Sequence, residues 1–367
     1  MTGQLFSALA VVIAVTVLAV SLAGCRHLRH TEAERHGAEL YGRMCSVCHG
    51  ASGEGYKADQ APAIGHQAFL GSVTDDYLRT AISNGRRGTT MSAWALAHGG
   101  PLSPEDVDAL IAFMRRWQRG PKPALNDRPT VGSADRGGTV FAQECAKCHG
   151  VRGQGGQNVG IGNRDLLATA SNGFLRFAIE KGRSNTAMPA FGEKLGRQGV
   201  EDVLAKVRSF QFLPPPAPPY TPPFRQQQAF EPPPRPPPLP LGKVTLNPRG
   251  PEPIGFNAWP GTTSADVIKG QLDRHARMGL LDARAPSDYT NEHLAGAVSV
   301  PFYDPDPYFD KLPKNTWLVC YCACPHAESG QLAQKLLAKG FTKVTVLNEG
   351  LGFWKSKKYG TEGSQKP

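Results

Sequence analysis

The chain has 367 residues, of which 41 are Lys or Arg and 31 are Asp or Glu, giving a formal net charge of +10. This length predicts two or three domains, and an apolar fraction of 40% supplies packed cores, which excludes a chain that is disordered throughout. The basic residues form no run longer than a pair, which disfavours a nucleic-acid-binding stripe. A mildly basic surface suits either docking to an acidic protein or plain solvation.

The first 25 residues indicate export and attachment to a membrane. Leu5 to Ala23 contains no charge, and the stretch closes on Leu22-Ala23-Gly24-Cys25. Small residues before a cysteine resemble the lipobox of bacterial lipoproteins, and this resemblance implies acylation of Cys25. The apolar run is also about long enough to cross a bilayer, so an uncleaved anchor is the alternative. Both interpretations tether residues 26–367 on the periplasmic side of a bacterial membrane.

A segment around the first pair of cysteines is repeated one hundred residues later. Tyr41-Gly-Arg-Met-Cys45-Ser-Val-Cys48-His49-Gly50 recurs as Phe141-Ala-Gln-Glu-Cys145-Ala-Lys-Cys148-His149-Gly150. Each copy continues with a Gly-Arg pair and a methionine loop, and ends in a helical pattern of apolar residues. The duplication predicts two small α-helical domains, over residues 30–120 and 133–212.

Proline dominates the next segment, with 14 prolines among the 27 residues 214–240. Such a composition favours polyproline II and cannot pack a core, so residues 213–245 are predicted to form a linker. At about 3.1 Å per residue, the proline-rich residues 214–240 reach roughly 80 Å. A spacer of this reach favours modules that work with separate partners over a fixed joint site.

Residues 246–362 have a different pattern, in which short apolar runs alternate with helical stretches. The runs are Leu280 to Asp282, Ala297 to Val300, Trp317 to Tyr321 and Val344 to Leu347. This alternation predicts an α/β domain with a mainly parallel sheet.

Each repeat contains the motif Cys-x-x-Cys-His, whose spacing has a chemical reason. Two thiols on one helical turn can add to the two vinyl groups of a haem, and the adjacent histidine then faces the iron. The predicted attachment residues are Cys45 and Cys48, then Cys145 and Cys148. A zinc site would need further ligands, and the second copy has no other Cys or His, so the motifs predict two covalently bound haem c groups.

The two repeats resemble class I c-type cytochromes. The resemblance implies His49 and His149 as proximal iron ligands, with a methionine opposite each. Met91 lies 42 residues after His49, and Met188 lies 39 residues after His149, each in a loop before the last helix. His98 is the alternative to Met91 in the first copy. Ligation by histidine and methionine leaves no open position on the iron, which suits electron transfer better than oxygen chemistry.

Residues 262–362 resemble a rhodanese domain. The resemblance rests on Leu281-Asp282-Ala-Arg284, on Glu292-His293-Leu294-Ala-Gly296-Ala297-Val298, on Val319-Cys-Tyr-Cys322 and on Glu349-Gly350-Leu351. It implies that Cys322 is the nucleophile of the family, held in a loop whose backbone N–H groups stabilise a thiolate. Attack by Cys322 on sulfane sulfur would then leave a persulfide.

The loop after Cys322 departs from the pattern of sulfurtransferases. It is one residue longer, has no arginine, and contains His326 and Glu328. An arginine would bind the sulfonate of thiosulfate, whereas Glu328 would repel it, so a polysulfide, a persulfide or another thiol is the expected donor. Cys320 is either a buried small hydrophobe or a resolving thiol, and Cys324 is undecided.

The sequence as a whole predicts a tethered dihaem cytochrome that transfers single electrons to and from redox proteins, such as other cytochromes or a membrane oxidoreductase. The rhodanese-like module predicts a link to sulfur metabolism through a sulfane-sulfur donor or carrier. Two alternatives remain: an enzyme that uses Cys322 with the haems as electron acceptors, and a redox sensor built on the three cysteines.

Overall fold

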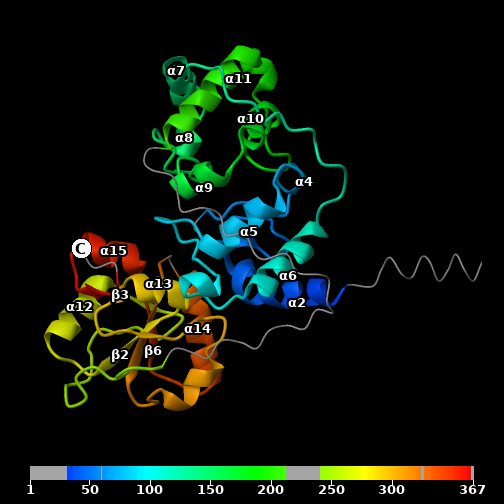
Figure 1. Ribbon diagram of the computed structural model, residues 1–367. Helices are drawn as coiled ribbons and strands as arrows, with labels where there is room; N and C mark the ends of the chain where they lie inside the picture. The colour runs from blue at the N-terminus through cyan, green and yellow to red at the C-terminus, as the bar shows by residue number, and fades with distance from the viewer. Residues whose placement is uncertain (1–30, 59, 212–239, 324–325, 365–367) are drawn as a thin grey trace, which may run out of the picture.

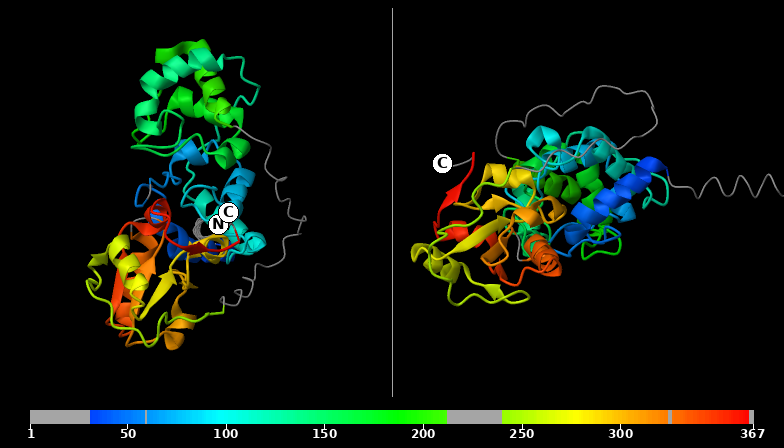
Figure 2. Two further views of the ribbon diagram at one scale, coloured as in Figure 1. Left: turned by 90° about the vertical axis from the view of Figure 1, so that its left-hand side faces the viewer. Right: turned by 90° about the horizontal axis from the view of Figure 1, so that it is seen from below.

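The computed structural model describes residues 31–58, 60–211, 240–323 and 326–364. It has three units, and the first helical unit lies between the second helical unit and a C-terminal α/β unit (Figure 1 and Figure 2). The predicted tether with Cys25, Cys324 and most of the proline linker lie outside the described residues. Within the described ranges, no helix has both the length and the apolar character that a bilayer crossing requires.

The first helical unit is built from short helices around one core. They are α2 (Glu32–Leu40), the π-turn η1 (Tyr41–Cys45), α3 (Ser46–His49), α4 (Gln67–Leu70), α5 (Asp75–Asn84), the 3-10 turn η2 (Leu96–His98) and α6 (Pro104–Arg115). Helix α6 starts as the sequence predicts, because Ser103 and Asp106 form a reciprocal capping box around a first-turn proline.

The second helical unit repeats this order. It contains α7 (Ala134–Glu144), α8 (Ala146–His149), α9 (Arg164–Thr169), α10 (Asn172–Lys181) and α11 (Gly192–Ser209). Helix α11 is broken at Gly196, whose φ of 60° is a left-handed conformation that glycine adopts without a side-chain clash.

In both units the first and last helices cross at a glycine. A Cβ on Gly37 of α2 would lie 2.0 Å from the carbonyl oxygen of Ala109 in α6, and a Cβ on Gly137 of α7 would lie 1.9 Å from that of Asp202 in α11. Neither distance leaves space for any side chain, so the two backbones touch directly at each crossing.

The two helical units meet through an arginine on each side. The guanidinium of Arg86 in the first unit donates from Nη1 to the carbonyl oxygen of Asp165, at 3.1 Å, and to Oγ1 of Thr169, at 3.2 Å. Both acceptors belong to α9 of the second unit, so the arginine satisfies polar groups of this short helix.

The second unit makes the equivalent contact with the first unit. Arg183 donates to the carbonyl oxygen of Ala68 and, at 3.1 Å, to Oγ of Ser72. Each of these residues has its counterpart 97 positions away in the chain, so the interface has an approximate two-fold axis. The rings of Tyr77 and Phe174, also 97 positions apart, stack on each other with centroids 5.5 Å apart.

The C-terminal unit has a parallel sheet of five strands in the order β1-β6-β5-β2-β4, which confirms the predicted fold class. Its elements are β1 (Thr262–Thr263), α12 (Ala265–Asp273), β2 (Met278–Asp282), α13 (Pro286–Asn291), β3 (His293–Leu294), β4 (Val298–Ser299), η3 (Asp306–Lys311), β5 (Trp317–Tyr321), α14 (Ala327–Ala338), β6 (Val344–Leu347), α15 (Gly350–Ser356) and β7 (Thr361–Glu362). Strands β3 and β7 form a separate antiparallel pair.

The helix crossing generates a prediction with a matched control on the neighbouring residue. We expect Gly137→Ala to lower the free energy of unfolding by about 1–3 kcal/mol, because the added methyl group overlaps the backbone of α11. At Gly138 a Cβ would meet nothing closer than 3.8 Å, so Gly138→Ala should be neutral or slightly stabilising. Urea unfolding followed by circular dichroism measures both; equal effects of the two variants would contradict the tight crossing.

Candidate functional site

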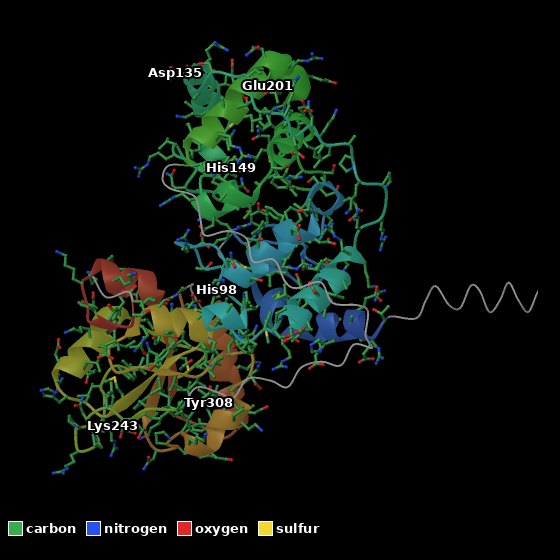
Figure 3. The ribbon with its side chains drawn as sticks, in the orientation of Figure 1. His98, Asp135, His149, Glu201, Lys243 and Tyr308 are labelled. Carbon is green, nitrogen blue, oxygen red and sulfur yellow. The ribbon has the colours of Figure 1, made fainter. Side chains whose placement is uncertain are left out.

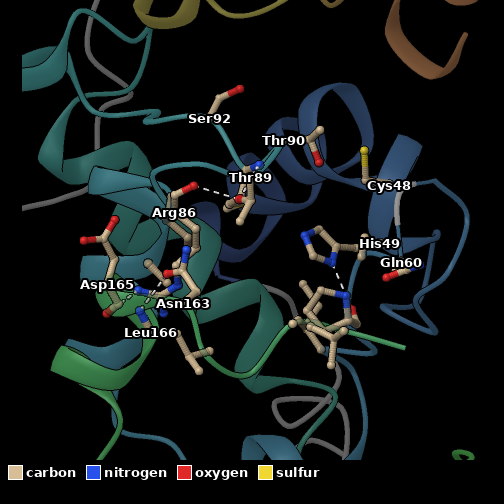
Figure 4. A pocket seen from close by; sticks show the side chains of 18 of the residues that line it. Cys48, His49, Gln60, Arg86, Thr89, Thr90, Ser92, Asn163, Asp165 and Leu166 are labelled. Atoms are coloured by element: carbon tan, nitrogen blue, oxygen red, sulfur yellow. Dashed lines mark hydrogen bonds between the residues drawn. The ribbon is translucent and has the colours of Figure 1, made fainter. Parts of the chain in front are cut away.

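A cavity of about 890 Å³ opens between the first helical unit and its two neighbours. Its lining brings together the first set of predicted haem residues: Cys45, Cys48, His49 and Met91. Figure 4 shows Cys48 and His49 on one side of this cavity and Arg86, Asn163 and Asp165 on the other. Apolar residues such as Leu78 and Leu110 complete the wall, as expected for a site that holds a large flat group.

The two predicted proximal histidines are buried in the same way. His49 is 8% exposed and its Nδ1 lies 3.0 Å from the carbonyl oxygen of Pro62, while His149 is 9% exposed and its Nδ1 lies 2.8 Å from that of Val159. A carbonyl oxygen only accepts, so Nδ1 carries the proton and Nε2 is left with a lone pair. A hydrogen bond from the ring nitrogen that does not bind the metal fixes the orientation of a metal-binding imidazole.

Burial also lowers the pKa of His49, which keeps its imidazole neutral and able to bind a metal ion. Met91, the predicted methionine ligand, lines the same cavity and lies in a turn in which the N–H of Arg86 donates to the Met91 carbonyl at 2.9 Å. The Met91 N–H in turn donates to Oγ1 of Thr89 at 3.1 Å.

The second methionine loop has the same geometry. The N–H of Arg183 donates to the carbonyl of Met188 at 3.0 Å, and the Met188 N–H donates to Oγ1 of Thr186 at 3.2 Å. Together with His149, which Figure 3 labels in the second unit, this loop repeats the first site. His98, the alternative to Met91, is exposed and its Nε2 lies 2.9 Å from Oδ1 of Asn84, outside the cavity lining.

Two of the four predicted attachment cysteines, Cys45 and Cys145, lie in surroundings that keep their thiols neutral. Burial raises the pKa of Cys45 to about 12 and that of Cys145 to about 11, with smaller contributions at Cys145 from Glu144 and Cys148. A zinc thiolate would need the opposite environment. In the part of the chain that the structure describes, no three His, Cys, Asp or Glu residues cluster as metal ligands. The donor set therefore fits covalent haem c.

Cys322 follows strand β5 and is 1% exposed. Its Sγ lies 3.3 Å from Oγ of Ser329 in the first turn of α14. The N–H of Leu351 donates to the Cys322 carbonyl at 3.0 Å, and the close packing of Gly350 against Ala323 leaves no room for a side chain there. The loop thus encloses the thiol from two elements.

The charged groups near Cys322 are mostly acidic. Glu328 is 7% exposed, and burial raises its pKa well above the usual range, with the charges of Cys322 and Asp288 adding to the rise. Arg284 bonds Asp282 through Nε at 3.0 Å and Nη2 at 2.6 Å. The raised pKa keeps Glu328 protonated and uncharged, and the Arg284 guanidinium is engaged with Asp282, so the predicted repulsion of thiosulfate gains no support from the charge of Glu328.

The side chains of His326 and Cys320 are both engaged in contacts within the rhodanese-like domain. The Nε2 of His326 lies 2.9 Å from the carbonyl oxygen of Asn348, so the ring is held at the backbone and away from an anion-binding role. Cys320 is fully buried in the middle of β5, and burial raises its pKa. It packs as a small hydrophobe, and the six described cysteines form no disulfide.

Comparisons with known protein families agree with this geometry. Residues 32–114 and 132–205 match the family described as cytochrome c oxidase, cbb3-type, subunit III, and residues 264–357 match the rhodanese-like domain. The chain joins two cytochrome c segments to a rhodanese-like domain. The cytochrome c segments correspond to the two helical units, and the rhodanese-like domain corresponds to the C-terminal unit.

Relatives of the cytochrome c segments are subunits of respiratory complexes. The cbb3-type cytochrome c oxidase subunit FixP of Azorhizobium caulinodans is 30% identical over 183 residues, covering 48% of this chain and 59% of that protein. The cytochrome bc1 complex cytochrome c subunit of Mycobacterium leprae is 27% identical over 184 residues, covering 48% and 61%. The chain therefore spans about three fifths of the length of these relatives.

Among solved structures, the rhodanese-like domain of a protein from Anabaena sp. is 31% identical to this chain. The match covers 29% of this chain and 83% of that one, with a TM-score of 0.27.

The sequence did not reveal which residues of different units meet. Arg86 and Arg183 were visible as a repeated Gly-Arg pair, and their repetition was the one available signal of a shared role. Ala323 and Glu328 line the cavity beside the first Cys-x-x-Cys-His motif, and no local sequence pattern predicts that they lie there. The long linker predicted modules that work with separate partners. The structure instead packs the rhodanese-like domain against the first cytochrome c segment. The linker permits this packing because a long flexible segment allows its two ends to lie close together.

The buried glutamate generates a prediction about pH. A carboxyl whose pKa is raised on folding keeps its proton where the unfolded chain has lost it, so it reduces stability as the pH rises above about 4.5. We expect Glu328→Gln to be more stable than the wild type by about 1–2 kcal/mol at pH 7, with the difference shrinking toward pH 4.5.

Urea unfolding at a series of pH values measures this difference, and Asp310→Asn, an exposed carboxylate of the same domain, is the control. A Glu328→Gln advantage that grows as the pH falls would contradict a raised pKa.

Proposed function

We propose that the protein is a dihaem c-type cytochrome that transfers single electrons between redox proteins. Two haem c groups are attached at Cys45 and Cys48 and at Cys145 and Cys148. Their iron ligands are His49 with Met91 and His149 with Met188. The observation that carries this proposal is the repeated pair of buried histidines, each with Nδ1 on a backbone carbonyl and each followed by the same methionine turn. Bound haem supplies a reversible one-electron couple.

The residues around the first site favour electron transfer over chemistry on a substrate. His49 and Met91 both line this one cavity, and an iron held by both would have no open position for oxygen. The apolar lining and the bonded turn of Met91 hold the ligands in place through a change of charge, which keeps reorganisation small.

The reciprocal contact of Arg86 and Arg183 supports electron exchange between the two sites. It places residues 152–166 of the second segment in the wall of the first cavity. An electron that enters one segment therefore has a short path to the other.

We further propose that the protein acts on the periplasmic side of a bacterial membrane, held by acylated Cys25 or by the apolar stretch Leu5 to Ala23. Its relatives are subunits of cbb3-type oxidases and bc1 complexes, which supports a membrane oxidoreductase or another cytochrome as the partner.

The rhodanese-like domain supports a second role, in sulfur-compound metabolism. Cys322 lies at the end of β5 against the start of α14, where a thiol can accept sulfane sulfur as a persulfide. The loop after Cys322 has no arginine that could bind the sulfonate of thiosulfate, which favours a polysulfide or persulfide donor. The alternative function is an enzyme that oxidises sulfane sulfur at Cys322 with the haems as electron acceptors.

The proposed ligation generates a prediction about redox potential. We expect Met91→His to lower the midpoint potential of one of two haems by on the order of 100 mV, because methionine favours the reduced iron more than histidine does. Redox titration followed by visible absorption measures it. Met278→Leu, at a buried methionine of β2 outside the cavity lining, is the control and should leave both potentials unchanged. If Met91→His leaves both potentials as they are in the wild type, the ligand assignment is wrong.

The sulfur role is tested by uptake of labelled sulfur. We expect the wild type to form a persulfide from labelled polysulfide and none from thiosulfate, and Cys322→Ser to lose all uptake. Cys320→Ala is the matched cysteine control, since Cys320 packs inside the sheet, and should retain uptake. Mass spectrometry of the alkylated protein gives the result; uptake that persists in Cys322→Ser would exclude this thiol.

A further inference from the structure

The first haem cavity and the Cys322 loop share residues. Ala323 and Glu328 line the cavity that Cys48, His49 and Met91 also line. Ala323 directly follows Cys322, and Glu328 precedes the serine whose hydroxyl contacts the Cys322 sulfur. The wall of the haem cavity is therefore also the enclosure of the rhodanese cysteine.

Specific contacts hold the rhodanese-like domain on the methionine side of this cavity. Oγ of Ser92, the residue after Met91, donates to Oδ2 of Asp288 at 2.5 Å. Oγ of Ser287 donates to the carbonyl oxygen of Ala93 at 2.7 Å. The domain is thus bonded to the loop that carries the proposed iron ligand.

Other contacts hold it on the side of the haem-binding motif. Arg43, two residues before Cys45, pairs with Asp304 at 3.5 Å and reaches the carbonyl oxygen of Tyr303. Helices α3 and α14 touch, and the rings of Trp94 and Tyr303 lie 5.7 Å apart. The rhodanese-like domain therefore contacts the first cytochrome c segment both at the methionine loop and beside the Cys-x-x-Cys-His motif. These contacts fix its position at the rim of the first proposed haem site.

This docking restricts what can reach the thiol. At 1% exposure, Cys322 is closed to a bulky sulfur-carrying protein in this arrangement. An anion would need a cation beside the thiol, and the Arg284 guanidinium is already engaged with Asp282. A small uncharged sulfur compound is excluded neither by its size nor by the need for a cation, and hydrogen sulfide is the simplest member of that class.

We propose that Cys322 and the first haem cavity form one joint site, in which hydrogen sulfide is bonded to Cys322 as sulfane sulfur and the first haem is the immediate electron acceptor. This inference rests on the proposed function and specifies its substrate and its electron path.

The reaction balances with the two haems of one chain. An S–S bond forms between Cys322 Sγ and the sulfide sulfur, while one S–H bond breaks on each partner. Two protons leave to solvent and two electrons leave to two ferric irons, one at the first site and one passed on to the second. The product is a persulfide on Cys322, and both haems end in the ferrous state.

The test adds hydrogen sulfide to the oxidised holoprotein without oxygen. Visible absorption follows haem reduction, and mass spectrometry after alkylation counts sulfur atoms gained on Cys322. We expect two haems reduced per persulfide in the wild type, and neither product in Cys322→Ser, which keeps the size of the side chain.

The docking is tested separately. Asp288→Ala removes the bond to Ser92 and should slow haem reduction by sulfide about tenfold, by lowering the docked fraction of the domain. Asp273→Ala removes a carboxylate paired only within α12 in the described contacts and should have no effect. Equal rates in Asp288→Ala and Asp273→Ala would overturn the joint site.

The remaining outcomes distinguish this inference from the proposed function. Haem reduction at the wild-type rate in Cys322→Ser, or a persulfide without haem reduction, overturns the inference and leaves the cytochrome intact. Failure of ascorbate to reduce the haems of the wild type would instead refute the electron-transfer function.

Discussion

In each cytochrome c segment two helix backbones touch directly, at Gly37 in the first segment and at Gly137 in the second. This contact fixes the distance between the parts of the segment that the two helices carry. Helix α2 leads directly into the turn that carries the proposed haem-attachment cysteines, and α6 follows the methionine loop. Because no side chain separates these helices, the two halves of the ligand set stay at a fixed distance. The cavity is a consequence of this crossing, and the docking of the third unit depends in turn on the cavity rim.

Much of this architecture is encoded locally and could be read from the sequence. The Cys-x-x-Cys-His motifs, the capped start at Ser103 and the apolar run Trp317 to Tyr321 each depend on neighbours within a few residues. The glycines at the crossings left a trace as well, since Gly37 and Gly137 are one hundred residues apart. Their role as the point of a close helix crossing could not be predicted, because the partner helix lies far away in the chain.

The contacts between units could not be predicted in this way. Ser92 and Asp288 are 196 residues apart, and nothing in either neighbourhood indicates the other. A serine and an aspartate on a surface usually bind water, so their pairing follows from shape and from the whole arrangement of three units. Glu328 illustrates the same limit, because the sequence predicted a role for it beside Cys322 but not its place in the cavity that Cys48 and His49 line.

The reciprocal arginines make the two cytochrome c segments an internal dimer. In a dimer of separate chains, a self-complementary interface must supply enough affinity to hold the copies together at cellular concentration. Here the chain between α6 and α7 fixes the local concentration of each half near the other, in the millimolar range for a short connection. The interface can therefore remain small, and each half is free to change alone. Thr169 facing Arg86 where Ser72 faces Arg183 is one such divergence, and the hydrogen bonds of the rhodanese-like domain to Ser92 and Ala93 of the first half are another.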